Sequence, residues 1–158
     1  MSLGAFNVSK MAEGLYQSLD LMIVIGSRLR GNETWTFKLD LPVNMVVVDC
    51  DPAADKRCYP NDDFVHSDAR YFLTALADAV KGRLTPDPAL QADFMATLDA
   101  AQNDLNAAIQ PYDRLVADLQ AIMPNEAIWV RDVTLSNSMW GNRLLKIDAP
   151  HCGVHALG

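Results

Sequence analysis

Two runs of consecutive apolar residues stand out in the first third of the chain, Leu21–Ile25 and Met45–Val48. Gly26 ends the first run, and the polar stretch Asp49–Pro52 ends the second. Strands that are apolar on both faces are typical of parallel sheets covered by helices on each side. The pattern therefore predicts an α/β domain with a three-layer, Rossmann-like parallel sheet.

The segments around these runs predict further elements. Met11–Leu19 has apolar residues at helical spacing and predicts a helix before the first strand. We expect a short helix over Asn32–Leu39 and a third, edge strand at Phe64–His66. Ser67 or Asp68 can cap the helix that follows. This helix has a wide apolar face made of Tyr71, Phe72, Leu73, Leu76, Ala79 and Val80.

Two prolines near the middle of the chain predict a boundary. Pro86 and Pro88 disfavour helix in the residues before them, so we divide the chain at this point. Beyond it, Ala89–Gln110 predicts an amphipathic helix of about six turns at 3.6 residues per turn. Its apolar face comprises Leu90, Phe94, Leu98, Ala101, Leu105 and Ile109.

The last third of the chain predicts one more helix and one more strand. Pro111 suits the first turn of a helix over Tyr112–Ile122. Ala127–Val130 is a short apolar run and predicts a fourth strand. We expect Val133–Gly158 to be loop-like.

Composition and charge narrow the function classes. The 158 residues are 50% hydrophobic and 21% charged, which is typical of a globular protein. Twenty acidic side chains against 13 basic ones give a net charge of -7, so we predict no nucleic-acid partner and no membrane partner. The apolar runs are far shorter than the roughly 20 residues of a membrane span. Three cysteines without ligand-like spacing predict a reduced, cytoplasmic protein.

Polar residues follow both apolar runs, at the edge where a doubly wound sheet binds its ligands. Gly26 lets a phosphate approach the backbone, Arg28 and Arg30 can pair with it, and Asp49 or Asp51 can accept a ribose hydroxyl. These residues indicate a nucleotide site. The alternative is that Gly26 only turns the chain and that the arginines are solvated or form local ion pairs. Neither the dinucleotide fingerprint nor the P-loop spacing is present.

Other polar groups give weaker signals. His66 lies in an apolar patch, which is typical of a partly buried histidine with its own hydrogen-bond partner. His151, Cys152 and His155 lack a fourth ligand, so we predict no zinc site there. The polar stretch at residues 132–140 either binds an anion through hydroxyl and amide groups or forms a capping turn.

The order of these motifs resembles one enzyme family. Ser18–Leu29 contains an acid, an apolar strand and Gly-x-Arg, Val46–Pro52 ends in Asp-x-Asp-Pro, and His66–Ala69 opens the next helix. Over residues 10–83 this succession is similar to the second half of the central domain of thiamine-diphosphate-dependent enzymes. It is most similar to the branch of acetohydroxyacid synthase (acetolactate synthase), oxalyl-CoA decarboxylase and benzoylformate decarboxylase.

The C-terminal part resembles the same family. Ile122–Asp132, Ser138–Trp140 and Gly153–Gly158 look like the opening of its diphosphate-binding domain. Serine and asparagine replace the glutamine and histidine of the synthases here, so the resemblance singles out no substrate. It implies that the cofactor's diphosphate lies at the residues just before the Met-Trp pair, which are Leu135, Ser136 and Asn137.

The resemblance implies three regions. Residues 1–84 correspond to the C-terminal half of a central domain of the DHS-like type, residues 85–110 to a linker helix, and residues 111–158 to an incomplete diphosphate-binding domain. The sequence lacks the family's metal motif, Gly-Asp-Gly followed by Asn, and the N-terminal domain whose glutamate helps to ionise the thiazolium carbon. We therefore expect a truncated piece of a decarboxylase or carboligase that uses thiamine diphosphate and Mg²⁺ on a 2-keto acid, and we expect the piece alone to be inactive.

Some members of this family bind FAD or ADP in the central domain, which the resemblance places at the same Gly26, Arg28, Asp49 and Asp51. Flavin-binding members carry an acid shortly after the arginine, where this chain has Leu29–Gly31, so we expect an empty or vestigial site. Two other functions stay open. One is a free-standing module for ADP, CoA or FAD, and the other is an interaction role for the long helix. Bare sheet edges predict a homo-oligomer.

Overall fold

A computed structural model describes residues 3–85, 87–132, 140–141 and 143–155. The chain forms two compact units, one of residues 8–95 and one of residues 1–7 together with 96–158. The fold is mixed α/β, with small parallel sheets flanked by helices, and is compatible with a Rossmann-like arrangement. The regions expected from the family resemblance stay a prediction.

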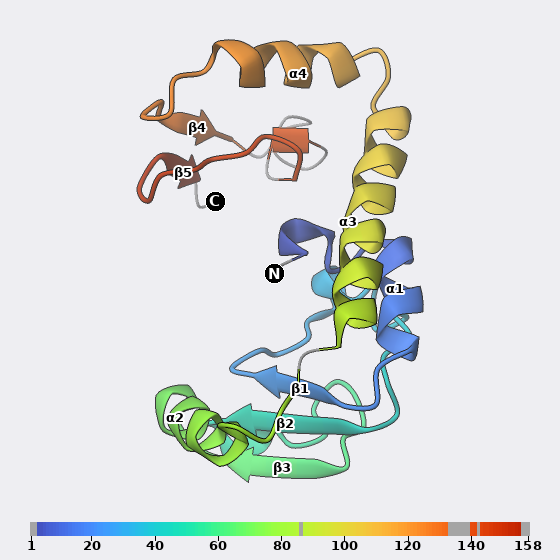
Figure 1. Ribbon diagram of the computed structural model, residues 1–158, viewed down its shortest axis with the longest axis vertical. Coiled ribbons are helices and arrows are strands. Elements are labelled where there is room, and N and C mark those ends of the chain that lie inside the picture. The colour runs from blue at the N-terminus through green and yellow to red at the C-terminus, as the bar shows by residue number, and fades with distance from the viewer. Residues whose placement is uncertain (1–2, 86, 133–139, 142, 156–158) are drawn as a thin grey trace. The chain divides into compact units, whose positions relative to one another are not determined.

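A three-stranded parallel sheet organises the unit of residues 8–95. Its order is β1 (Met22–Ile25), β2 (Met45–Asp49) and β3 (Asp63–His66). Figure 1 shows the three strands side by side with their arrowheads at the same edge. The three strands predicted in this half are confirmed, and β3 lies at an edge of the sheet as expected.

One face of this sheet forms the core of the unit. Val24 pairs with Val47, Val47 pairs with Phe64, and the two valines are buried together with Met45. Met22, Leu29, Leu41 and Tyr59 pack against this cluster. On the other face Val48 is 1% exposed but Ile23 is 37% exposed. The expectation that both faces are covered is therefore met in β2 and not in the edge strand β1.

Two α-helices of this unit begin with a side-chain cap. Ser9 accepts a hydrogen bond from the Ala12 N–H at the start of α1 (Lys10–Gln17), and Asp68 accepts one from the Arg70 N–H at the start of α2 (Ala69–Val80). Both helices were expected, and α2 packs against β2.

The wide apolar face predicted for α2 is not buried. No residue of this helix is buried, and Tyr71 is 75% exposed. Hydrophobic spacing gives the period of a helix, but whether the apolar stripe is covered depends on what packs against it.

The connection between β1 and β2 is not the short helix expected over Asn32–Leu39. A single 3₁₀ turn, η2 (Gly31–Glu33), is followed by three left-handed residues, Trp35, Thr36 and Phe37, with φ of 50°, 59° and 64°. Buried Thr34 holds the turn, since its carbonyl accepts the N–H groups of residues 38 and 39. Local hydrogen bonds therefore replace the helical ladder here.

The second unit contains a two-stranded parallel sheet. It begins with the 3₁₀ turn η1 (Gly4–Phe6), and β4 (Trp129–Arg131) pairs with β5 (Gly153–His155). Figure 1 shows these two strands side by side. The expected fourth strand is confirmed, although it starts two residues later than predicted. The expectation of a loop after residue 133 is wrong at β5, because this strand gains its pairing from β4 rather than from its own composition.

Two helices precede this sheet along the chain. α3 (Pro88–Ala108) and α4 (Asp113–Ile122) confirm the two predicted helices, but Pro111 lies before the N-cap Tyr112 rather than in the first turn. Of the apolar face expected for this helix, α3 buries only Ala101. No helix in the described ranges combines the length and apolar character that crossing a membrane requires.

A small aromatic core holds this unit together. Ile109, Val116 and Trp140 are buried, and Leu105, Leu119, Trp129 and Leu144 pack against them. The rings of Trp129 and Trp140 lie 5.8 Å apart at 44°. The two indole rings therefore pack against each other in this core.

Candidate functional site

The candidate site lies at the carboxyl edge of the sheet formed by β1, β2 and β3. Gly26 leaves β1 with φ of +60°, a conformation that disfavours residues with a side chain, and its N–H donates to the Val48 carbonyl at 2.9 Å. Ser27 then stabilises the left-handed Leu29, whose N–H donates to the Ser27 hydroxyl at 3.3 Å. The turn after β1 is thus built against the end of β2.

The loop after β2 is closed by its own acidic residues. The Asp51 N–H donates to Asp49 Oδ1 at 2.8 Å, and the Ala53 N–H donates to Asp51 Oδ1 at 2.9 Å. The second interaction caps the 3₁₀ turn η3 (Pro52–Ala54). Asp49 and Asp51 therefore each satisfy a backbone donor of the loop.

Arg57 completes this loop. Its Nη2 donates to Asp51 Oδ2 at 2.6 Å, and its Nε donates to the Ala53 carbonyl at 2.9 Å. The Arg57 guanidinium lowers the pKa of Asp51, with further contributions from the Ala53 N–H and the charge of Arg28. The Asp51 hydrogen bond raises the pKa of Arg57 in return. Asp51 is consequently held as a carboxylate.

His66 lies at the same edge but not in the expected environment. It is exposed rather than partly buried, although it has the hydrogen-bond partner that was expected. Its Nε2 donates to the Cys50 carbonyl at 2.9 Å, and its ring is stacked on Phe64 at 6.5 Å. Because β3 is the edge strand, one side of His66 faces solvent, and its role is to tie β3 to the loop after β2.

The structure brings the four predicted nucleotide residues to one edge of the sheet. Sequence reasoning missed Arg57, because its contact with Asp51 depends on the turn η3 and not on a motif. The cavity at this edge measures about 20 Å³, which holds about one water molecule. It is lined in part by Ser27, Arg28, Arg57 and Cys58. Nucleotide pockets measure several hundred Å³, so this cavity is far smaller than a nucleotide site.

The residues predicted for the diphosphate of thiamine, Leu135, Ser136 and Asn137, lie outside the described residues. Within the described ranges, no group of three or more His, Cys, Asp or Glu residues is arranged to hold a metal ion.

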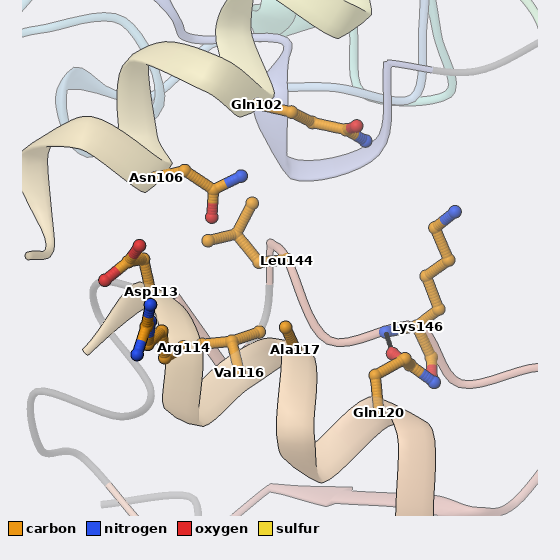
Figure 2. Close-up of a pocket in the computed structure, with 9 residues that line it drawn as sticks. All are labelled: Gln102, Asn106, Asp113, Arg114, Val116, Ala117, Gln120, Leu144 and Lys146. Carbon is orange, nitrogen blue, oxygen red and sulfur yellow. Dashed lines mark hydrogen bonds between the residues drawn. The ribbon is translucent and has the colours of Figure 1, made fainter. Parts of the chain in front are cut away.

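Two larger pockets lie elsewhere. One, of about 470 Å³, is formed by α3, α4 and residues 144–146. Figure 2 shows Asn106 directed toward Leu144 and Gln120 beside Lys146. The Gln120 amide bonds the backbone of Lys146 twice, accepting from its N–H at 2.7 Å and donating to its carbonyl at 3.3 Å. Gln120 is therefore already used in positioning the chain.

The other pocket, of about 730 Å³, lies at the opposite, amino edge of the three-stranded sheet. Its lining includes Lys10 and Lys38 as well as Glu13, Asp40 and Asp62. Because the lining contains both basic and acidic side chains, it selects for no ligand charge. Neither larger pocket contains a residue predicted from the sequence to bind a cofactor.

Comparisons with known proteins add no assignment. No protein-family model matches this chain, and no curated protein is significantly similar to it.

Proposed function

We propose that this chain is part of a thiamine-diphosphate-dependent 2-keto acid decarboxylase or carboligase, similar to acetolactate synthase. Residues 1–84 would supply half of the central domain as a three-layer α/β structure, and residues 111–158 the opening of the diphosphate-binding domain. The parent enzyme would be a cytoplasmic homo-oligomer.

One observation carries the proposal. The strand-end motifs that resemble the family follow β1, β2 and β3, and these strands are parallel and adjacent in chain order. Gly-x-Arg, Asp-x-Asp-Pro and the start of α2 therefore share one edge of the sheet. Ligands of open parallel sheets bind at this edge, so the arrangement favours a coenzyme-binding ancestor over unrelated chain reversals.

Exposed apolar residues on the strands support a larger parent structure. Ile23 of β1 is 37% exposed, and the paired Val130 and Val154 of the small sheet are 66% and 45% exposed. Strands of parallel sheets are normally covered on both faces. These side chains fit strands that continue into larger sheets.

The cofactor assignment rests on the resemblance alone. Ser136 and Asn137 would hydrogen-bond the diphosphate of thiamine, with Leu135 beside it, and the Mg²⁺ ligands would come from the Gly-Asp-Gly motif that this sequence lacks. When bound, thiamine diphosphate supplies the nucleophilic carbon that attacks a 2-keto acid. We expect the 158-residue chain alone to show no decarboxylase activity, since it lacks the metal motif and the activating glutamate.

The first test is the coding sequence around this chain. We expect an open reading frame that continues into a glycine-rich turn, Gly-Asp-Gly and a later Asn, and a stop codon directly after Gly158 would count against the proposal. The complete protein should release carbon dioxide from a 2-keto acid only with thiamine diphosphate and Mg²⁺.

Variants of the complete protein test the site residues. Ser136→Ala and Asn137→Ala should each raise the concentration of thiamine diphosphate needed for half-maximal activity by about tenfold, because each removes a hydrogen bond to a charged group. Asn125→Ala, in the exposed turn before β4, is the matched control and should change it less than twofold. An equal rise of this concentration in all three variants would contradict the assignment of Ser136 and Asn137 to the diphosphate.

The alternative, a free-standing module for ADP, CoA or FAD, has the shared strand edge in its favour. The 20 Å³ cavity and the Arg57–Asp51 ion pair stand against it.

A further inference from the structure

The predicted nucleotide edge carries an arginine that the sequence reasoning did not include. We infer that Arg57 is an internal ligand of this edge, which takes the Asp51 carboxylate that a ribose hydroxyl would need and so excludes flavin and adenine nucleotides. The inference goes beyond the proposed function and does not depend on it, since it concerns the chain's own residues at the ends of β1 and β2.

Asp51 is already engaged by groups of its own loop. Both of its carboxylate oxygens accept a hydrogen bond, one from the Ala53 N–H at 2.9 Å and one from Arg57 Nη2 at 2.6 Å. The second is charge-assisted, and such bonds are about twice as strong as neutral ones. Each oxygen keeps a second lone pair, but a ribose hydroxyl is a neutral donor and is therefore the weaker competitor for the side of Asp51 that Arg57 covers.

Arg57 is held in place from two sides. Its Nε donates to the Ala53 carbonyl at 2.9 Å while its Nη2 bonds Asp51. The planar guanidinium is thereby fixed over the turn η3, and its rotamer is set by two partners in the same loop. The side chains of Arg57 and Asp51 are 33% and 46% exposed, so solvent screens the charge of this pair and the position of Arg57 depends on both of its hydrogen bonds.

The cavity at this edge is small. The cavity between the ends of β1 and β2 is about 20 Å³, and the Arg57 side chain forms part of its wall. Tyr59 and Leu29 form other parts of the wall, and both pack against the core of the sheet. The larger opening that a nucleotide requires would therefore have to come first from movement of Arg57.

The basic and acidic side chains at this edge balance each other in charge. Two arginines, Arg28 and Arg57, face two aspartates, Asp49 and Asp51, at this edge. The cluster carries no formal excess of positive charge, so a phosphate gains little long-range attraction here. A ligand would also have to break the Arg57–Asp51 pair, and an exposed pair of this kind lowers the affinity by at most about fivefold.

Calorimetry on the full chain tests the exclusion. Titration with ADP and with FAD to millimolar concentration should give no saturable heat for the wild type. Saturable heat that is lost in Asp51→Ala would overturn the inference, because the carboxylate would then be open to a nucleotide.

Residue-resolved amide hydrogen exchange tests the internal ligand itself. Arg57→Gln should raise the exchange rate of the Ala53 amide about tenfold, since the carboxylate that accepts this N–H loses its anchor. In an Asp51→Ala background the same substitution should add less than a further twofold, because both residues act through one interaction. Arg70→Gln, which removes an exposed arginine from α2, is the matched control and should leave the Ala53 amide unchanged.

Two exchange results would contradict the inference. One is an unchanged Ala53 amide in Arg57→Gln, and the other is an equal effect of Arg57→Gln with and without Asp51. None of these measurements involves thiamine diphosphate, so their outcome is separate from that of the proposed function.

Discussion

The Glu13 side chain of α1 accepts a hydrogen bond from the Asp40 backbone N–H at 2.9 Å, across 27 residues of sequence. The same carboxylate pairs with Lys10 at 2.6 Å, and Lys10 in turn lies over the ring of Trp35 at 5.0 Å. One acid thereby ties the first helix to the connection that leads into β2. The amino end of the sheet depends on this contact, because the connection between β1 and β2 has little regular structure of its own.

Glu13 gives stability a specific pH dependence. The Lys10 hydrogen bond, followed by the Asp40 N–H, lowers the pKa of Glu13. A group whose pKa is lower in the folded state contributes stability that is fully present above its unfolded pKa, about 4.3, and is lost as pH falls through the folded value. Glu13→Gln should therefore flatten the decline of Tm below about pH 4. Glu126→Gln, in the exposed turn before β4, should leave the profile unchanged, and parallel profiles for both variants would contradict this account.

The left-handed turn at Thr36 predicts a stabilising substitution. Non-glycine residues lose about 1–2 kcal/mol in this conformation, whereas glycine loses about 0.5–1 kcal/mol of extra backbone entropy on folding. Thr36 is exposed with φ of 59°, so Thr36→Gly should raise the free energy of unfolding by about 0.5–1 kcal/mol in urea denaturation. Thr74→Gly, in the exposed face of α2, should lower it by about 0.5 kcal/mol. A loss of stability in both variants would show that the turn is not strained.

β1 and β2 could be predicted because their apolar runs are continuous and each is ended by polar residues, and β3 from the short apolar patch at Phe64–Val65. β5 could not, because Gly153–His155 contains one strongly apolar residue and becomes a strand through pairing with β4. The left-handed residues 35–37 also carry no sequence signal. Their conformation follows from hydrogen bonds to the carbonyls of Gly31 and Thr34.

The candidate site shows a similar division. Parallel strands place their carboxyl ends at one edge, so sequence could predict that Gly26, Arg28 and Asp51 approach one another. It could not predict that Asp51 is already bonded by Arg57. That depends on the shape of the turn η3, which brings residues 51 and 57 together.

Met45 should be the most costly single truncation in the core of residues 8–95. Its side chain is 1% exposed and belongs to the cluster with Val24 and Val47. Met45→Ala removes this packing and leaves a cavity, which costs about 2–5 kcal/mol of unfolding free energy. Met11→Ala, at a position of α1 that is 41% exposed, should cost less than about 0.5 kcal/mol. Similar urea midpoints for the two variants would show that the core is not packed around Met45.

Self-association should depend on the uncovered edge strand. β1 has one neighbour among the described strands, and Leu21 and Ile23 at this edge are 50% and 37% exposed. An open edge with apolar side chains pairs readily with another chain, and a lysine there disfavours such pairing. We expect a dimer or larger species in light scattering at micromolar concentration, and Ile23→Lys should shift it toward the monomer.

Val43 supplies the matched control for this experiment. It is 87% exposed but lies in the connection before β2, outside the strand edge. Val43→Lys adds the same charge at another exposed apolar position. It therefore tests whether a loss of exposed apolar surface is by itself enough to reduce self-association. If the edge pairs through its backbone, Val43→Lys leaves the mean mass from light scattering unchanged, whereas Ile23→Lys lowers it. A sharp monomer for the wild type, or an equal response to both lysines, would exclude edge pairing as the cause of association.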